Sequence, residues 1–364
     1  MKKLLCVVLM LMQLCGCVPI EKSAEQGTDR YITGVWVSFY ELDGMLKGDF
    51  KAEFNAAVQN CKSRGIGDMF VCVRPHCDAV YRSKWFPLRD SAAGYNFDVL
   101  EYMIELCHQN NICFHAWINP YRVCTTDNDV TKLPADSPVK KLLSEKDIST
   151  ENGIYLNPAS QKVRALIIDG VREIINKYDV DGIHFDDYFY PSTSESFDAS
   201  SYADYCANTD TPLPLADWRR ANINALIGGV YTAVKFKDKD LLFSVSPSAS
   251  IEDNYNKQYA DIAAWVDSGC VDLIIPQLYF GFDYPDPAFK FDNLLNDWLQ
   301  LAVGKQTRLA IGLATYKINT QSEPDRTEWA NGTDVINRQT KICKQNGDIS
   351  GHIFFSYSSM VQCL

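Results

Sequence analysis

Short apolar segments alternate with amphipathic segments along most of this chain, and this alternation constrains the fold more than any other feature. Seven of the amphipathic segments place apolar residues three and four positions apart, which is typical of helices. The predicted helices cover residues 50–64, 96–110, 160–178, 217–235, 258–267, 291–303 and 333–345. The predicted strands cover residues 32–39, 68–75, 113–120, a segment within 179–191, 241–248, 272–280, 308–316 and 351–358.

The eight predicted strands are apolar throughout, as strands must be when helices cover both faces of their sheet. A regular alternation of strand and helix implies a parallel sheet, and eight such units imply closure into a (β/α)8 barrel. We therefore expect one α/β barrel domain over residues 31–364. Few residues follow the last predicted strand, so we expect the last outer helix to be missing or reduced.

Composition supports a globular protein and argues against nucleic acid as a partner. Hydrophobic residues make up 46% of the 364 residues, which is enough for a large core, and the formal net charge is −11. A phosphate-binding surface needs a basic stripe, and the sequence has none.

The first residues have the pattern of an export signal. Two lysines at positions 2 and 3 precede an apolar core over residues 4–14, which is too short to span a membrane in a mature protein. The sequence LCGC that ends at Cys17 resembles a bacterial lipobox, in which the Cys17 thiol carries a lipid. We expect residues 1–16 to be a lipoprotein signal peptide and residues 17–30 a lipidated cysteine with a flexible tether. The mature protein is then expected in the cell envelope, anchored to a membrane and facing the periplasm or the exterior.

The cysteines and histidines do not predict a metal site. Three of the 13 cysteines lie in the signal, and the other ten are scattered without a CxxC pair. We interpret most of the ten as small buried hydrophobic residues, with an isolated disulfide left open for an exported protein. His115, His184 and His352 lie within predicted strands and are interpreted as core residues. We expect no metal and no cofactor.

Two consecutive aspartates, Asp186 and Asp187, end the fourth predicted strand. In a parallel barrel the carboxyl ends of the strands face the substrate, so acidic residues there are candidates for chemistry. Two adjacent carboxylates also repel each other unless a cation, a proton or a substrate relieves them. A purely structural pair that binds an arginine is the competing interpretation, and the position at the end of a buried strand favours the catalytic one.

Other strand ends supply aromatic rings, amides and cations. Aromatic rings can stack on the apolar faces of pyranosides while polar groups take the hydroxyls, so this mixture favours a sugar as substrate. The candidate substrate-binding residues are Arg74, His76, Asp78, Trp117, Asn119, Tyr121, Arg122, Tyr188, Gln277, Tyr279 and Tyr316.

Several blocks of sequence near the strand ends carry a family resemblance. They are GVWVSFYE, VCVRPHCDAVYRSKWFP, FHAWINPYRV, YLNP, VDGIHFDDYFYP, SVSPSAS, DLIIPQLYF and LAIGLATYK. Together they resemble the glycosyl hydrolase-like 10 family of bacterial exported lipoproteins, over about residues 31–358. The resemblance implies a (β/α)8 glycosidase barrel that needs no cofactor. It also implies action on peptidoglycan glycan strands, notably strands stripped of peptides.

The block DGIHFDDY is also similar to the fourth-strand motif of family 18 chitinases, whose acid is a glutamate at the last position, where this chain has Tyr188. The pair Asp186–Asp187 is more similar to the tandem carboxylates of substrate-assisted N-acetylglucosaminidases. That resemblance implies that Asp187 is the general acid. Asp186 would then polarise the 2-acetamido group or act directly as nucleophile, with Asp78 or Glu41 as a fallback partner.

We therefore expect a hydrolase of O-glycosyl bonds in an N-acetylated glycan. One alternative is an α-glycosidase for dietary or storage glycans with Asp186 as direct nucleophile. That architecture needs an acid after the fifth strand, where the chain has Ser246 and Ser248, with Glu252 further on. The other alternative is a non-catalytic glycan-binding lipoprotein. The sequence leaves the oligomeric state open.

Overall fold

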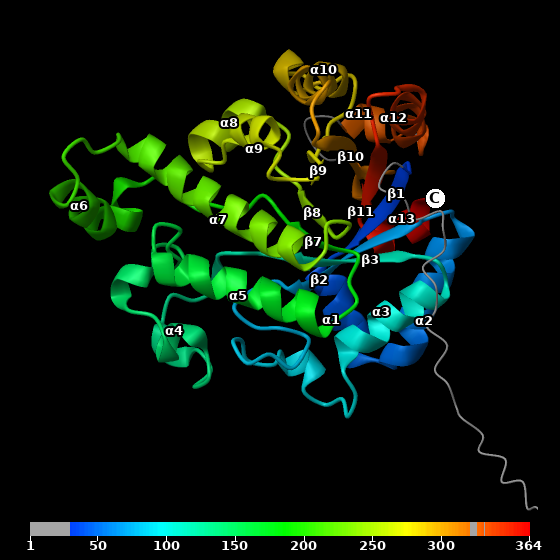
Figure 1. Cartoon of the computed structure of the whole chain (residues 1–364). Coiled ribbons are helices and arrows are strands. Elements are labelled where there is room, and N and C mark those ends of the chain that lie inside the picture. The colour runs from blue at the N-terminus through cyan, green and yellow to red at the C-terminus, as the bar shows by residue number, and fades with distance from the viewer. Residues whose placement is uncertain (1–29, 321–325, 331) are drawn as a thin grey trace, which may run out of the picture. The chain divides into compact units, whose positions relative to one another are not determined.

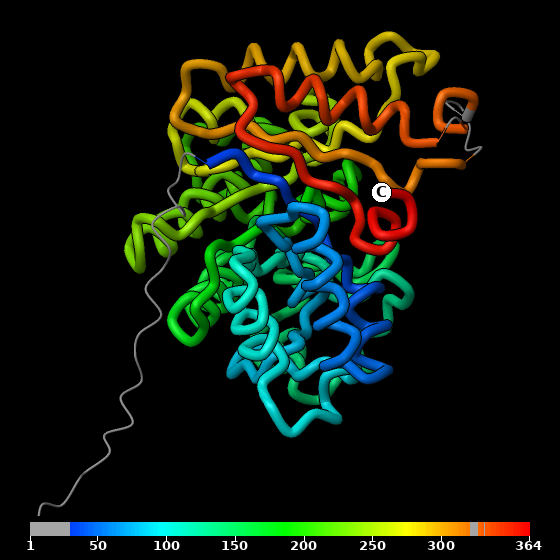
Figure 2. The backbone as a smooth tube through the Cα atoms, turned by 90° about the vertical axis from the view of Figure 1, so that its right-hand side faces the viewer, coloured from blue at the N-terminus to red at the C-terminus, as the bar shows by residue number. Residues whose placement is uncertain are grey.

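Eight parallel strands close into a barrel in this protein. The structure is a computed structural model that describes residues 30–320, 326–330 and 332–364, and Tyr31–Leu364 form one compact unit. The signal and lipidation predicted for residues 1–17 lie outside the described residues. Around the barrel the strand order is β1-β11-β10-β9-β8-β7-β3-β2, and β1 pairs with both β2 and β11. The predicted (β/α)8 barrel is confirmed, and Figure 2 shows the first and last strands side by side where it closes.

The barrel strands agree with the sequence pattern in position, although several are shorter than predicted. They are β1 (Ile32–Val37), β2 (Asp68–Arg74), β3 (Cys113–Ile118), β7 (Gly182–Phe185), β8 (Leu242–Val245), β9 (Leu273–Ile274), β10 (Arg308–Ala314) and β11 (Gly351–Phe355). β9 stops early because Pro276 follows and has no N–H to donate to the ladder. Isolated bridges from Gln277 to Ser248 and Gly312 continue the barrel wall beyond it.

Helices cover the outside of the barrel (Figure 1). The long helices α5 and α7 pack side by side there. The principal outer helices are α2 (Phe50–Ser63), α3 (Val99–Gln109), α5 (Gln161–Lys177), α7 (Leu215–Lys237), α9 (Ile262–Ser268), α10 (Phe291–Ala302) and α12 (Asp334–Gln345). After β11 the chain forms only the short helix α13 (Tyr357–Cys363), so the last outer helix is reduced, as predicted.

Strand alternation divides the core into two layers. Met69, Val71 and Val73 of β2 point to the helices and join the large outer core. Phe70 of the same strand points inward and packs with Trp36 in a smaller cluster inside the barrel. Within each strand, this period of two sets whether a side chain points into the barrel or towards the helices.

Two of the predicted core histidines lie inside the barrel, each with a polar partner. His115 is 3.0 Å from the Asp68 carboxylate, and His184 accepts a hydrogen bond from the Trp36 indole at 3.0 Å. Burial lowers the pKa of His184 well below its usual range, so the ring is neutral. His352, also buried, contacts the Tyr31 hydroxyl at 3.0 Å. All three rings are buried, which agrees with their interpretation as core residues.

Two segments differ from the prediction. Ser38 begins a helix, α1 (Phe39–Lys47), through a capping box with Glu41, where the sequence was interpreted as strand and loop. The helix predicted over residues 258–267 begins later, as α9, and an additional helix, α8 (Ile251–Lys257), precedes it. Tyr259, with a left-handed φ of 54°, lies between the two helices.

The long connections after β3 and β7 contain further elements. The first holds a small antiparallel sheet in the order β4-β6-β5, formed by β4 (Arg122–Cys124), β5 (Ile148–Ser149) and β6 (Ile154–Leu156), and the helix α4 (Pro138–Lys141). The second holds the helix α6 (Ala199–Ala207), and β10 is followed by α11 (Arg326–Trp329).

The ten cysteines of the described residues are all free, and six of them are buried. Their burial agrees with their interpretation as small hydrophobic residues. Within the described residues, no helix has the length and apolar character needed to cross a membrane.

Candidate active site

A pocket of about 450 Å³ lies at the carboxyl ends of the barrel strands. All eight strands, or the residues just after them, contribute to its lining, which is the usual site of chemistry in such barrels. Of its lining residues, those predicted from the sequence are Trp117, Asn119, Arg122, Asp186, Asp187, Tyr188, Gln277, Tyr279 and Tyr316.

Asp186 is fixed at the base of the pocket by donors from β3. It lies two residues after His184, so its side chain points into the barrel like that of His184, and it is 3% exposed. The Trp117 indole donates to one carboxylate oxygen at 3.1 Å, and the Asn119 amide donates to the other at 2.9 Å. Burial raises the pKa of Asp186, while the charge of Arg122 and the bonds from Asn119 and Trp117 oppose that rise. Two N–H donors on one carboxylate favour its ionised form.

Asp187 lies beside it in a different environment. Burial raises the pKa of Asp187 to about 7, and the neighbouring charge of Asp186 adds to the rise. A hydrogen bond involving Gln277 and the charge of Arg122 offset part of it. The pair therefore favours one proton held mainly on Asp187, with Asp186 ionised. A carboxylic acid with a pKa near neutral pH beside an ionised carboxylate is the electrostatic arrangement that glycosidases need.

Asn119 connects the aspartates to the next segment of the chain. While its amide nitrogen donates to Asp186, its amide oxygen accepts the backbone N–H of Arg122 at 2.8 Å. Arg122 begins β4, and its guanidinium lies 4.0 Å from the centre of the Tyr188 ring. One side chain thus holds both the carboxylate and the cation at the pocket rim in place.

Aromatic rings form much of the remaining wall. Tyr279 stacks on Phe355 with ring centres 5.6 Å apart, and Tyr316 meets both rings edge-on at 6.0 Å. Tyr188 and Tyr316 are 54% and 45% exposed, so part of each ring is accessible to a ligand. Exposed rings beside hydrogen-bonding groups suit the apolar faces and hydroxyls of a sugar.

Arg74 does not line the pocket, although the sequence places it at the end of β2. The pairing of β2 with β3 shifts register between Cys72 and Arg74, so that Arg74 lies opposite Ile118 instead of Asn119. Ile118 belongs to the outer core, and Arg74 therefore turns outward, where its guanidinium stacks 4.3 Å from the Phe86 ring. The bulge reverses the direction that simple alternation predicts.

The other predicted residues after β2 also lie outside the pocket lining. Asp78 forms an ion pair of 2.6 Å with Arg89. His76 packs edge-on against Phe39, behind the pocket wall. Burial, together with the charges of Arg122 and Arg89, lowers the pKa of His76 to about 4.

Tyr121, predicted from the loop after β3, is 1% exposed in the outer core. The backbone next to Tyr121 pairs with the small sheet, since Leu156 donates its N–H to the Tyr121 carbonyl at 2.8 Å. Tyr121 therefore does not line the pocket.

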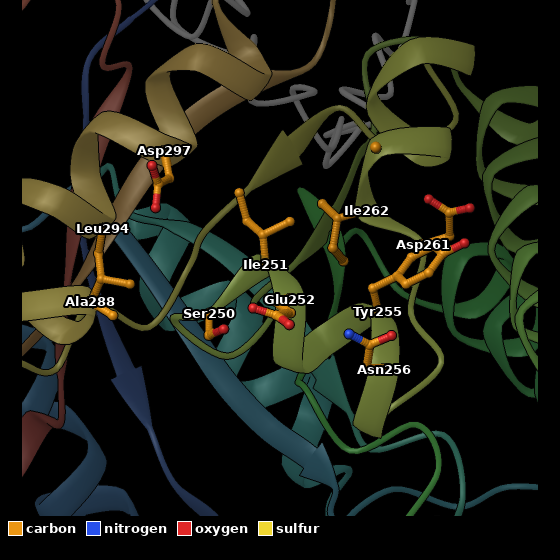
Figure 3. Close-up of a pocket in the computed structure, with 11 residues that line it drawn as sticks. Ser250, Ile251, Glu252, Tyr255, Asn256, Asp261, Ile262, Ala288, Leu294 and Asp297 are labelled. Carbon is orange, nitrogen blue, oxygen red and sulfur yellow. The ribbon is translucent and has the colours of Figure 1, made fainter. Parts of the chain in front are cut away.

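Neither Glu41, one of the two fallback acids, nor Glu252, the acid of the α-glycosidase alternative, lines the pocket. Glu41 accepts bonds from Ser38 and, at 2.7 Å, from the Ser356 hydroxyl and the Ser358 N–H, so it ties α1 to the last strand. Glu252 lies on α8 and lines a separate pocket with Tyr255 and Asp297 (Figure 3). At the end of the fifth barrel strand the pocket has Ser246, which bears no acid. The arrangement therefore disfavours an α-glycosidase with an acid at that strand.

Some lining residues were not singled out from the sequence. They are Trp36, Ser38, Phe39, Tyr40, Cys72, Pro75, Thr125 and Phe355. The position of Trp36 in the alternation of β1 could have identified it. Trp36 lies opposite Phe70 of β2, and both side chains point into the barrel. Phe39 and Tyr40 were unpredictable because they belong to a helix turn that the strand pattern did not indicate.

No group of three or more potential metal-ligating side chains occurs in the described part of the chain. The pocket lining contains two carboxylates, one arginine and no histidine among those residues.

Comparisons with known proteins agree with this geometry. The family model described as "Glycosyl hydrolase-like 10" matches residues 31–331. The glycosyl hydrolase YngK of Bacillus subtilis (strain 168) is 29% identical over 373 residues, covering 94% of this chain and 71% of that protein. The glycosyl hydrolase DigH of Escherichia coli (strain K12) is 30% identical over 323 residues, covering 80% of this chain and 72% of that protein.

Among solved structures, the PgaB (BpsB) glycoside hydrolase domain from Bordetella bronchiseptica superposes with a TM-score of 0.64. The sequence identity is 12%, and the match covers 91% of this chain and 96% of that domain. This likeness supports the barrel fold.

Proposed function

Since this chain belongs to the glycosyl hydrolase-like 10 family and is a glycoside hydrolase, we propose that it cleaves an N-acetylated glycan, namely the glycan strands of peptidoglycan. Asp186 and Asp187 are the proposed catalytic centre. The observation that carries the proposal is the inequivalence of these two carboxylates, the only acids among the described residues of the pocket lining.

The proposed reaction begins with proton donation. Asp187, held protonated by burial, gives its proton to the glycosidic oxygen as the bond to the anomeric carbon breaks. The oxygen of the substrate's 2-acetamido group attacks that carbon, and a cyclic oxazolinium forms. Asp186 stabilises the charge that develops on the amide nitrogen. Asp187, now ionised, removes a proton from water, which opens the ring and returns the enzyme to its starting state.

Two features favour substrate assistance over a nucleophile from the protein. Asp186 is 3% exposed and both its oxygens already accept N–H donors from Trp117 and Asn119, which suits a fixed electrostatic role better than covalent attack. If Asp186 is not the nucleophile and Asp187 is the acid, no third carboxylate in the described lining can serve. The substrate's own acetamido group then supplies the attacking oxygen.

We also propose that the protein is exported and anchored to a membrane by a lipid on Cys17. The support is the lipobox-like LCGC sequence. Cys17→Ser is expected to release the protein from the membrane fraction or to leave it as unprocessed precursor. Normal processing and membrane partitioning of that variant would contradict the anchor.

The catalytic proposal is tested with peptide-free peptidoglycan strands, by measuring the release of reducing ends. Substrate analogues separate the two mechanisms. N-trifluoroacetyl in place of N-acetyl is expected to slow cleavage, because fluorine makes the attacking oxygen less nucleophilic. A 2-fluoro sugar is expected to leave no covalent adduct on Asp186.

Glu252→Gln is the matched control, since Glu252 is the nearest acid after the fifth barrel strand and lies in the separate pocket. Its turnover is expected to equal that of the wild type. A glycosyl adduct on Asp186 found by mass spectrometry would overturn substrate assistance. Loss of turnover in Glu252→Gln would instead revive the α-glycosidase alternative.

A further inference from the structure

Arg122 is the one cation among the described residues that line the pocket. The protein has a net charge of −11, and the pocket already holds two carboxylates. An anionic substrate can enter such a site only if a local positive charge receives it. The role of Arg122 therefore bears on which glycans the enzyme accepts.

Arg122 forms one side-chain hydrogen bond with Tyr188, and this contact leaves its other guanidinium donors available. Its guanidinium carbon is 4.0 Å from the centre of the Tyr188 ring, so one flat face is stacked. A stacked guanidinium keeps its N–H donors in the plane, along its edges, where they can bind a carboxylate through two parallel bonds. Arg89 shows the contrast, because its edges are occupied by Asp43 and Asp78. No ion pair joins Arg122 to a carboxylate within the described part of the chain.

Arg122 is also held at a fixed distance from the reaction centre. Its backbone N–H donates to the Asn119 oxygen at 2.8 Å, and the Asn119 nitrogen donates to Asp186 at 2.9 Å. Pairing of Arg122 with Tyr155 of β6 restrains the backbone from the other side. Arg122 and the two aspartates also line the same pocket, so a group bound by Arg122 lies near the sugar being cleaved.

We propose that Arg122 binds a free carboxylate on the glycan next to the scissile bond and thereby makes the enzyme selective for N-acetylated glycans that carry one. This inference deepens the proposed function and rests on it. The carboxylate can belong to the lactyl ether of an unsubstituted muramic acid or to a uronic acid. A lactyl group joined to a peptide has no free carboxylate, so peptide-bearing strands lose this ion pair.

The test compares kcat/KM of wild type, Arg122→Gln and Arg122→Lys on four substrates. They are peptide-free peptidoglycan strands, the same strands with their lactyl carboxylates methyl-esterified, hyaluronan oligosaccharides and chitin oligosaccharides. Binding of each to Asp187→Asn, with and without Arg122→Gln, is measured by calorimetry. Arg172→Gln removes the same charge from an exposed position on α5 and is the matched control.

Esterification is expected to lower the kcat/KM of the wild type by roughly 10- to 100-fold, the range for a lost charge-assisted hydrogen-bond pair. Arg122→Gln is expected to lower kcat/KM by a similar factor on free strands, but not on esterified strands. In that variant, esterification of the strands is expected to lower kcat/KM little further. Arg122→Lys keeps the charge without the planar fork, so it is expected to be intermediate. The hyaluronan arm shows whether a uronic carboxylate replaces the lactyl one.

Equal cleavage of free and esterified strands by the wild type would overturn this inference and leave the proposed function intact. An equal loss on charged and neutral glycans in Arg122→Gln would also overturn it, because Arg122 would then act only through the aspartate pair. Absence of wild-type turnover and binding on every N-acetylated glycan would reject both. Unchanged melting temperatures show that the variants are folded.

Discussion

The ends of two barrel strands, β2 and β7, both carry charged residues, but only those after β7 line the pocket. Charged side chains lie at the end of both strands. Arg74 is the last residue of β2 and Asp78 follows it, while Asp186 and Asp187 follow β7. The pair after β7 lines the pocket. The residues after β2 turn outward or join an ion-pair network with Arg89.

The difference shows that the carboxyl end of a barrel strand is a necessary but insufficient sign of a catalytic residue. After β7 the chain keeps its alternation, so Asp186 follows His184 inward. In β2 a register shift reverses the last residue of the strand. Asp78 and Asp43 then have a strong partner in Arg89, whose hydrogen bonds oppose the effect of burial and lower the pKa of Asp43. The acids after β7 therefore have no ion-pair partner among the described residues. The acids near the end of β2, in contrast, form ion pairs with Arg89.

The largest expected contrast is between Asp187→Asn and Asp78→Asn. Loss of the general acid at Asp187 is expected to lower kcat roughly 100- to 10,000-fold on a glycan with a poor leaving group. Asp78→Asn keeps the side-chain volume and Asp78 does not line the pocket, so its kcat is expected to stay within roughly 5-fold of the wild type. Reducing-end assays on both variants measure this. A comparable collapse in Asp78→Asn would erase the distinction between the two strand ends.

Asp186→Asn is expected to have the next largest effect. It removes the charge that Trp117 and Asn119 hold in place, and electrostatic stabilisation of this kind is worth roughly 100- to 1,000-fold in kcat. Because the amide can still accept one of the two N–H donors, the variant is expected to fold. A kcat near that of the wild type, with the fold confirmed by circular dichroism, would remove Asp186 from the catalytic centre.

The pH dependence of the rate is expected to report the raised pKa of Asp187. The acid works when protonated, so kcat/KM is expected to fall about tenfold per pH unit above about 7. Asp78→Asn is expected to keep this limb, and Asp187→Asn is expected to lose it. A wild-type profile that is flat from pH 6 to pH 9 would show that no group of this kind controls the reaction.

The same pKa predicts a smaller effect on stability. The folded pKa of Asp187 lies above its unfolded value, so between about pH 4 and about 7 the folded state holds a proton that the unfolded state releases. Stability contributed by this group therefore falls as the pH rises through that window. Asp187→Asn is expected to flatten the fall, measured as melting temperature against pH. An unchanged slope in the variant would assign the pH dependence to other groups.

Arg89→Gln tests the other strand end and is expected to change mainly stability. Its loss leaves Asp43 and Asp78 partly buried without their cation. We expect the free energy of unfolding to fall by roughly 1–3 kcal/mol, less than for a fully buried pair because these side chains are partly exposed. Urea denaturation measures it, and kcat is expected to change little. A large loss of kcat with unchanged stability would place this network in catalysis.

Local pattern in the sequence was sufficient for the barrel and for the centre of the site. Apolar runs of period two and helical runs of period 3.6 are local properties, and they located all eight strands and most outer helices. Asp186, Asp187, Tyr188 and Asn119 were predictable because each lies just after the carboxyl end of a barrel strand, where the pocket lies.

Only the tertiary structure decided which other strand-end residues share that pocket. The direction of Arg74 depends on a register shift between neighbouring strands, and that of Glu41 depends on a hydrogen bond from Ser356, which follows the last strand. The raised pKa of Asp187 depends on burial by residues far apart in the chain. A one-residue shift in pairing turns a side chain to the opposite face of a sheet, and no local period in the sequence records where such a shift occurs.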